Sequence, residues 1–199
     1  MSEQADGPRR ILVFCASSGS CEPHFHEAAN GLGREIARAG HSLVYGGGAV
    51  GSMGALADGA LAEGGEVIGI IPRFMRELEW AHPDITQLRL VEDMQQRKRD
   101  MLAASDAIVT LPGGSGTLEE LFEAITSKRL GLYPHPIVIL NQGGFYDPLF
   151  SLLEGSVSER FMHEAHLDMW QAVERVEEIL PAIEASAQWP RNALEFATR

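Results

Sequence analysis

The sequence contains little cysteine, few basic residues and no long apolar run, and each shortage disfavours a class of protein. Cys15 and Cys21 are the only cysteines among 199 residues, so a disulfide framework is disfavoured and both thiols are expected to be reduced. The net charge of −12 argues against general affinity for DNA or RNA, which requires a basic surface. No apolar stretch approaches the roughly 20 residues of a membrane helix, so no membrane partner is expected.

The remaining composition is that of an ordinary globular protein, with 45% hydrophobic and 22% charged residues. The first ten residues, MSEQADGPRR, contain no apolar signal core, which argues against secretion. A chain of 199 residues is long enough for one well-cored domain and short for two. We therefore expect one cytoplasmic domain over 1–199, with a flexible N-terminus at 1–9 and a C-terminal tail at 188–199.

Short apolar runs alternate with helical patterns along the chain. This alternation predicts a doubly wound, Rossmann-like α/β fold, in which a mostly parallel sheet is covered by helices on both faces. Strands are expected at Arg10–Cys15, Ser42–Tyr45, Glu66–Ile71, Leu88–Val91, Ala107–Leu111 and Pro136–Asn141, with a last one near Leu167. Helices are expected at His24–Ala39, Ser52–Glu63, Glu92–Ala104, Thr117–Leu130, Pro148–Val157 and Val173–Ala187.

Three loops rich in small residues each follow a predicted strand directly. ASSGS follows the first strand, GGGAVG the second and PGGSGT the fifth. In a doubly wound sheet, ligands bind outside the carboxyl ends of the strands. The three loops are therefore expected to open on one edge of the sheet and to share one cleft.

The PGGSGT loop has the composition of a phosphate site. Glycine lets the main chain approach an anion closely, and the following helix presents unpaired amides to the same point. Ser115 and Thr117 add hydroxyl donors. No lysine follows the glycines, which disfavours the P-loop of nucleoside triphosphatases, and an ordinary tight turn remains an alternative.

The GGGAVG loop matches the pattern G-x-G-x-x-G through Gly46, Gly48 and Gly51. A dinucleotide site also requires an acidic residue near the end of the next strand, and Arg73 lies there instead. Arg73 leaves NADP binding open, because a cation favours the 2′-phosphate. Close packing of the following helix on the sheet is an alternative at least as good.

Two interpretations of Glu120 are open. Thr117 and Glu120 have the spacing of a capping box, in which Glu120 bonds back to the amide of Thr117. Alternatively, Glu120 lies in the cleft beside a bound phosphate ester. A carboxylate is unfavourable there unless it stabilises positive charge, and cleavage of an N-glycosidic bond develops such charge on the sugar.

Positive charge near the cleft is provided by Arg97, Lys98 and Arg99, which lie in the helix before the PGGSGT strand. The alternative is a solvated basic stripe that pairs with acidic residues of the same helix. Those acidic residues are Glu92, Asp93 and Asp100.

Together these motifs resemble the LONELY GUY (LOG) family of cytokinin riboside 5′-monophosphate phosphoribohydrolases. The family motif PGGxGTxxE occurs here as PGGSGTLEE at 112–120. Its companion, an Arg-Lys pair followed by Met, occurs as Arg97, Lys98 and Met101. The segments LVYGGGAVGSMG, VIGIIP, SDAIVTLP and PIVILNQGGFYDPL also resemble family segments in order, so the resemblance covers nearly the whole chain.

The resemblance implies an enzyme that hydrolyses the N-glycosidic bond of adenosine 5′-monophosphates, plain or N6-substituted, to free base and ribose 5-phosphate without metal or cofactor. It implies that Arg97 and Glu120 are catalytic, and that the protein is a homodimer whose partner can contribute to each site. The implied substrate-binding residues are Gly46, Gly47, Gly48, Lys98, Gly113, Gly114, Ser115, Gly116 and Thr117, with Ser17, Ser18 and Glu79 beside the cleft. For Glu79, a solvated helix end is an equal alternative.

Two features depart from the family pattern. Ser127 stands where tryptophan is common, and the first loop reads CASS where glycine often precedes the serines. Neither departure touches the motif residues. Ser127 leaves the selectivity for the base and the local dimer surface open.

Three other functions compete with the hydrolase. A nucleotide or molybdopterin-type carrier on the same fold would keep the glycine loops without requiring Arg97 and Glu120 together, so their joint presence favours the enzyme. An NADP-dependent oxidoreductase rests on GGGAVG and Arg73 alone. Lysine decarboxylation, a label often given to this family, requires pyridoxal phosphate on a lysine, and the only lysines, Lys98 and Lys128, lack the context of a cofactor site.

Overall fold

The computed structural model of the protein describes residues 7–78, 80–187 and 189–190. They contain a seven-stranded sheet in the order β4-β3-β2-β1-β5-β6-β7, with every neighbouring pair parallel. The strands are β1 (Arg10–Phe14), β2 (Ser42–Tyr45), β3 (Val67–Pro72), β4 (Gln87–Val91), β5 (Ala107–Thr110), β6 (Ile137–Leu140) and β7 (Gln171–Val173). The predicted doubly wound, Rossmann-like fold is confirmed.

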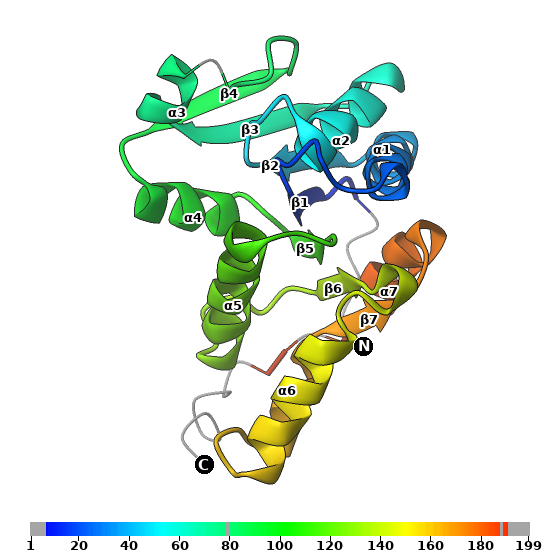
Figure 1. Ribbon diagram of the computed structural model, residues 1–199, viewed down its shortest axis with the longest axis vertical. Coiled ribbons are helices and arrows are strands. Elements are labelled where there is room, and N and C mark those ends of the chain that lie inside the picture. The colour runs from blue at the N-terminus through cyan, green and yellow to red at the C-terminus, as the bar shows by residue number, and fades with distance from the viewer. Residues whose placement is uncertain (1–6, 79, 188, 191–199) are drawn as a thin grey trace.

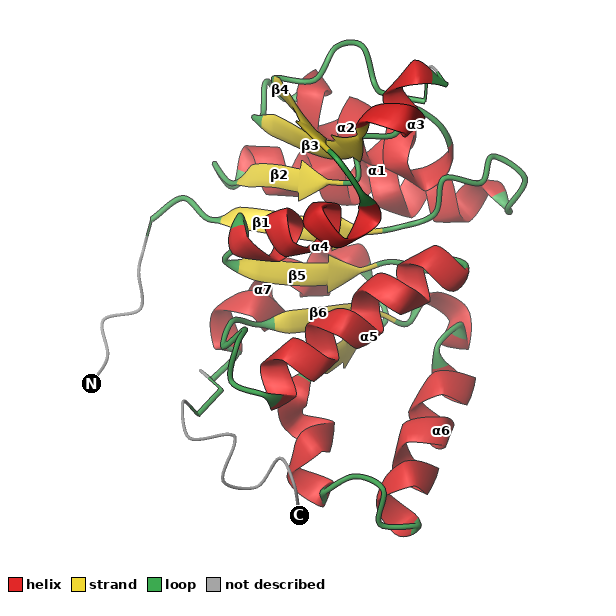
Figure 2. Cartoon of the chain, turned by 90° about the vertical axis from the view of Figure 1, so that its left-hand side faces the viewer, coloured by secondary structure: helices red, strands yellow, loops and turns green. Residues whose placement is uncertain are grey.

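Helices cover both faces of this sheet. Successive side chains of a strand point to opposite faces, so each strand contributes to a buried cluster on either side. Ile11 and Val13 of β1 face α1, α2 and α7, whereas Leu12 and Phe14 face α4 and α5 (Figures 1 and 2). These helices are α1 (Pro23–Arg38), α2 (Gly51–Ala62), α4 (Met94–Ala103), α5 (Ser115–Arg129) and α7 (Ile179–Ala185). The other helical elements are α3 (Arg73–Glu77), α6 (Asp147–Ser158) and the 3₁₀ turns η1 (Gln142–Gly144), η2 (Glu164–Met169) and η3 (Val176–Glu178).

The strand order reverses at β1, which has β2 on one side and β5 on the other. From β1 the chain proceeds outward through β2, β3 and β4, and it returns to start the second half at β5. The loops after β1 and β5 therefore flank the reversal point, and the loop after β2 lies next to them. This is the position at which doubly wound sheets bind ligands.

Helices α1 and α2 cross closely because glycines lie at their contact. A Cβ on Gly33 would lie 2.1 Å from the carbonyl oxygen of Leu56. A Cβ on Gly59 would lie 2.1 Å from the carbonyl oxygen of Asn30. The two helix backbones thus touch without intervening side chains, which fixes α2 and the glycine turn before it.

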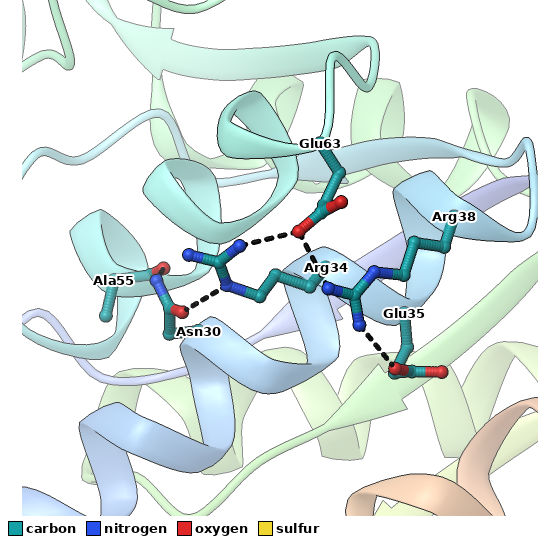
Figure 3. A network of polar contacts seen from close by, with 6 residues as sticks. All are labelled: Asn30, Arg34, Glu35, Arg38, Ala55 and Glu63. Carbon is teal, nitrogen blue, oxygen red and sulfur yellow. Dashed lines mark hydrogen bonds and ion pairs between the residues drawn. The ribbon is translucent and has the colours of Figure 1, made fainter.

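A polar network fastens the same crossing (Figure 3). Arg34 donates from Nη1 to Oε1 of Glu63 at 2.6 Å and from Nε to Oδ1 of Asn30 at 3.0 Å. Arg38 reaches the same Glu63 oxygen through Nη2 at 2.9 Å. Hydrogen bonds from Arg38 and Arg34 lower the pKa of Glu63, so this carboxylate stays ionised and joins the end of α2 to α1.

The C-terminal part differs from the sequence prediction. The last strand is β7 at Gln171–Val173, whereas Leu167 lies in the 3₁₀ turn η2. The last helix begins at Ile179, because Val173 belongs to β7 and η3 follows it. β7 is three residues long and two of its side chains are exposed, so it lacks the apolar run that marks the other strands.

The predicted flexible N-terminus (1–9) and C-terminal tail (188–199) lie largely outside the described residues. The segment between β3 and β4 begins with the short helix α3. None of the helices in the described ranges combines the length and apolar character needed to cross a membrane.

Candidate active site

The PGGSGT loop leads directly into the N-terminus of α5. Gly114 is the residue before the helix, no side chain caps it, and the amide of Leu118 makes a 3.0 Å bond to its carbonyl oxygen. The amides before Leu118 have no acceptor within the helix, so they can bind an anion. Gly114 and Gly116 are exposed and have open space beside them. This geometry fits the predicted phosphate site.

Gly113 has a separate role in this loop. A Cβ at Gly113 would lie 2.2 Å from Oγ1 of Thr117, so only glycine leaves room for the side chain of Thr117 against this turn. Thr117 is buried and Ser115 is exposed. The hydroxyl of Thr117 is therefore held inside the turn, while that of Ser115 faces outward.

The predicted capping box of Thr117 and Glu120 is wrong. α5 begins at Ser115, two residues before Thr117, so Thr117 already lies within the first turn. Gly114, which is in an extended conformation, is the residue that precedes the helix, and Ser115 is the first helical residue. Glu120 therefore does not cap the helix.

Glu120 is buried on α5, with 6% of its surface exposed. Burial raises the pKa of Glu120 to about 7, against the opposing effect of the positive charge on Arg97. The loss of hydration thus outweighs the attraction of Arg97, and the resulting pKa lies near neutral pH.

Arg97 is buried where β2 and β3 end. Its Nε donates to the carbonyl oxygen of Ile70 at 3.1 Å, and its Nη2 donates to that of Gly46 at 3.0 Å. A Cβ on Gly46 would lie 2.1 Å from Nη2, so glycine is required for this approach. Burial lowers the pKa of Arg97 and Glu120 opposes this, but a guanidinium remains protonated in proteins. Arg97 is thus a fixed cation within electrostatic reach of Glu120.

Lys98 points to α5 instead of to the glycine loops. Its ammonium pairs with Glu119, and it lies 2.5 Å from a carboxylate oxygen of Glu123. Arg97 and Lys98 are both buried, so the alternative of a solvated basic stripe is wrong for these two residues, whereas Arg99 is exposed. Contact of Lys98 with substrate stays a prediction.

The GGG turn after β2 is held by its carbonyl groups. Besides the bond from Arg97 to Gly46, the amide of His82 donates to Gly47 at 2.9 Å and the hydroxyl of Tyr45 donates to Gly48 at 3.2 Å. Gly47 has φ +80°, which favours glycine. The turn is therefore fixed in shape beside Arg97.

The first loop, which contains Ser17 and Ser18, packs on the start of α2. A Cβ on Gly51, whose φ is +64°, would lie 2.4 Å from the carbonyl oxygen of Ser18. The amide of Met53 donates to the carbonyl oxygen of Ala16 at 3.1 Å. Ser17 and Ser18 are exposed next to the glycine turn, so the predicted neighbours lie on one edge.

Two other predicted residues give no support to an additional ligand. Arg73, the basis of the NADP alternative, pairs with Glu92 at 2.8 Å on the surface. Glu79 lies outside the described residues. Within the ranges that the structure describes, no cluster of three or more His, Cys, Asp or Glu residues is arranged to hold a metal ion.

Sequence reasoning missed two buried residues at this edge. Cys15 follows β1, and its pKa is raised by burial first and then by Glu120, while Arg97 lowers it. Tyr146 donates from its hydroxyl to the carbonyl oxygen of Leu111 at 2.7 Å, which fixes the chain just before the PGGSGT loop. The position of Cys15, immediately after a strand and before a loop, is the signal that could have identified it.

Neither of two sizeable cavities is lined by Arg97 or Glu120. One of about 370 Å³ is lined by Lys128, Trp170 and Trp189, near the far end of α5. The other, of about 340 Å³, is lined by Arg76, His82 and their neighbours.

Comparisons with known proteins identify relatives over most of the chain. The sequence model of the family described as possible lysine decarboxylase matches residues 53–183. The chain is 38% identical over 190 residues to a probable cytokinin riboside 5′-monophosphate phosphoribohydrolase of Oryza sativa subsp. japonica, covering 96% of this chain and 84% of that protein. It is 44% identical over 159 residues to a cytokinin riboside 5′-monophosphate phosphoribohydrolase of Rhodococcoides fascians, covering 79% and 80% respectively.

A solved structure, the molybdenum cofactor binding protein from the phototrophic bacterium Rippkaea orientalis, has a TM-score of 0.70 to this chain. Its sequence is 22% identical, and the match covers 90% of this chain and 97% of that one. At this identity the likeness shows the fold alone.

Proposed function

The chain belongs to the LOG family of cytokinin riboside 5′-monophosphate phosphoribohydrolases, and we propose that it hydrolyses the N-glycosidic bond of adenosine 5′-monophosphates. The substrates are AMP or its N6-substituted relatives, and the products are the free base and ribose 5-phosphate. The burial of Glu120 beside the open N-terminus of α5, within the electrostatic reach of Arg97, carries this proposal.

The phosphate and the sugar have separate places in this mechanism. The free amides of α5 bind the 5′-phosphate, and this binding, which is remote from the reacting bond, orients the ribose. Arg97, fixed by the carbonyl oxygens of Ile70 and Gly46, holds the phosphoribosyl group. The sugar carbon then lies within reach of Glu120, three residues beyond Thr117 on the same helix.

Glu120 acts in its ionised form. It stabilises the oxocarbenium-like carbon as the bond to the base nitrogen breaks, and it accepts a proton from the water that attacks this carbon. A new bond from carbon to water oxygen replaces the glycosidic bond, while the base leaves with the electron pair of the broken bond and takes up a proton from solvent, to which Glu120 returns the proton it accepted. The ionised fraction increases as the pH rises through the pKa of about 7, so the rate is expected to rise with it.

The test is incubation of the purified protein with AMP and with isopentenyladenosine monophosphate, followed by chromatography for free base. Adenosine is the matched control, since it offers the same glycosidic bond without the phosphate that binds α5. Release of base from either nucleotide, and much less from adenosine, is expected. Absence of free base from both nucleotides would reject the hydrolase.

The alternative is a non-catalytic nucleotide or molybdopterin-type carrier. It is favoured by the fold shared with the Rippkaea orientalis protein, and it would give nucleotide binding without base release. The two relatives named above, which match most of this chain at 38% and 44% identity, bear the name of the hydrolase. That name and the joint presence of Arg97 and Glu120 support the enzyme.

The lysines do not fit the cofactor that decarboxylation requires. Pyridoxal phosphate needs a lysine amine for its Schiff base. The ammonium of Lys98 is held by Glu119 and Glu123. Lys128 donates to the carbonyl oxygen of His135 at 2.8 Å, late in α5 and far along the helix from the phosphate site.

We further propose a single cytoplasmic domain that forms a homodimer. Both cysteines are free, which supports a reducing compartment. Helix α6 buries Leu153 alone, while Leu152 and Phe161 nearby are 63% and 81% exposed. Such apolar exposure supports a contact with a second chain at this end of the molecule.

A further inference from the structure

A second cluster of reactive side chains lies beside the first loop and has no part in the proposed hydrolysis. Cys21 Sγ is 3.4 Å from His26 Nε2, and His26 Nδ1 is 3.2 Å from the Ser52 hydroxyl oxygen. The imidazole of α1 therefore lies between a thiol of the loop and a hydroxyl of α2. Ser52 is 1% exposed, whereas Cys21 is only partly buried.

This arrangement is that of a nucleophile with its base. An activated thiol needs a base within hydrogen-bond reach and a third group that orients the base. When His26 Nδ1 donates its proton to the Ser52 oxygen, Nε2 is left as an acceptor for the thiol proton of Cys21. Because Ser52 is buried at the start of α2, it holds the ring in one orientation.

The other cysteine provides a contrast. Cys15 is 1% exposed, and burial, reinforced by Glu120, raises the pKa of its thiol. A thiol with those properties is unreactive, because the thiolate is the nucleophile and reagents cannot approach. Only Cys21 combines access with a neighbouring base.

We propose that Cys21 is a nucleophilic thiol, activated by His26, that forms mixed disulfides with small disulfides such as oxidised glutathione. Sγ attacks one sulfur of the reagent while its proton passes to His26. A bond forms between Sγ and that sulfur, and the second half of the reagent leaves and takes up the proton as a free thiol. The disulfide itself is the oxidant, so no other reactant is needed.

The modification also opposes hydrolysis, a consequence that rests on the proposed function. The carbonyl oxygen of Ser18 packs on Gly51, and Cys21 lies three residues further along the same loop. A tripeptide on Sγ would displace the contact with His26 and move the loop that carries Ser17 and Ser18. Because that loop borders the proposed substrate site, the affinity for the nucleotide is expected to fall.

The test exposes the whole folded chain to oxidised glutathione and follows adducts by mass spectrometry. One adduct is expected, on Cys21, with Cys15 as the internal control that remains unmodified. Cys21→Ser should take up none. His26→Gln should slow the reaction by about a hundredfold, the smaller end of what general base catalysis contributes. Equal rates for wild type and His26→Gln, or modification of Cys15 as fast as Cys21, would overturn the proposal.

Unfolding in guanidinium chloride controls for damage to the fold. There both thiols should react, and the wild type and His26→Gln at the same rate, so a difference confined to the folded state belongs to the contact between Cys21 and His26. A difference that persists in denaturant would refute the role of His26. The labelling is measured without substrate, so its outcome tests the reactivity of Cys21 independently of the proposed hydrolase activity.

Activity is a separate readout. In an active wild-type preparation, the adduct should raise the KM for AMP and dithiothreitol should restore it, while Cys21→Ser should be active and insensitive. An adduct on Cys21 that leaves KM unchanged would reject the effect on hydrolysis and leave the thiol assignment in place.

Discussion

Glu120 shows how burial and charge compete at one carboxyl group. The hydrocarbon and backbone around it disfavour the ionised form, and Arg97 favours it, with a resulting pKa of about 7. A carboxyl group of that kind changes its charge within the physiological pH range. Function and stability should therefore depend on the same proton.

The first prediction concerns turnover. Glu120→Gln keeps the size of the side chain but removes the charge, so kcat should fall by about a hundredfold or more, with little change in AMP binding measured by calorimetry. Near-normal kcat would show that Glu120 is not catalytic.

The second prediction concerns stability. Because the folded pKa is raised from 4.5 to about 7, the folded protein binds more protons than the unfolded chain between these values. The free energy of unfolding should therefore fall as the pH rises through this window, by about 3 kcal/mol at most. In urea denaturation, Glu120→Gln should be more stable than wild type at pH 8 and should lose this advantage at pH 4. An equal difference at both pH values would contradict the assigned burial.

The third prediction concerns the contact between the Arg97 guanidinium and Gly46. Gly46→Ala places a methyl group against Nη2, so the guanidinium should move and kcat/KM should fall by about tenfold or more. The displaced atom is the end of a flexible side chain, so the melting temperature should change little. Gly31→Ala, which has open space around it, is the matched control and should have normal activity.

Single residues were the least predictable part of the site. The PGGSGT motif indicated an anion site, but the spacing of Thr117 and Glu120 fits a capping box equally well. Only the position of the helix start at Ser115 separates the two. The bonds from Arg97 to carbonyl oxygens of β3 and of the GGG turn join segments far apart in sequence, and local patterns contain no information about such contacts.

At the scale of elements, the crossing of α1 and α2 supports the fourth prediction. Gly33→Ala would bring a methyl group against the backbone of Leu56, which cannot turn aside as a side chain does. The free energy of unfolding should fall by about 1–3 kcal/mol. Gly31→Ala, in the same helix but with open space beside it, should be neutral or more stable by up to about 1 kcal/mol. Equal effects in urea denaturation would show that the helices do not touch at Gly33.

Most elements were predictable from local patterns, whereas those of the C-terminal part were not. The strands from β1 to β6 all lie within a residue or two of their predicted ranges, and all of them except β4 stand out from the sequence as hydrophobic strands inside a parallel sheet. β7 has the sequence QAV and lies at the edge, where only the pairing with β6 makes it a strand. The segment that follows it, ERVEE, has a helical composition, yet α7 begins only at Ile179.

For the whole molecule, the fifth prediction concerns association. If the exposed apolar side chains at α6 contact a second chain, Leu152→Asp should convert the dimer to a monomer in sedimentation velocity, because a buried charge there has no partner. Leu132→Asp is the control, since Leu132 is 75% exposed and lies outside α6. Dimerisation unaffected by Leu152→Asp would place the contact elsewhere.

The position of β1 in the middle of the sheet has a consequence for biosynthesis. β1 is made first, yet Ile11 pairs with Ala107 of β5, so one side of this apolar strand has no neighbour until about half of the chain has left the ribosome. Strand pairings between segments this distant in sequence form slowly, and the apolar surface of the unpaired strand stays exposed until they form. A nascent chain halted before β5 should therefore depend on chaperones and retain no nucleotide, since the two loops that flank the reversal point come together only when translation has passed both.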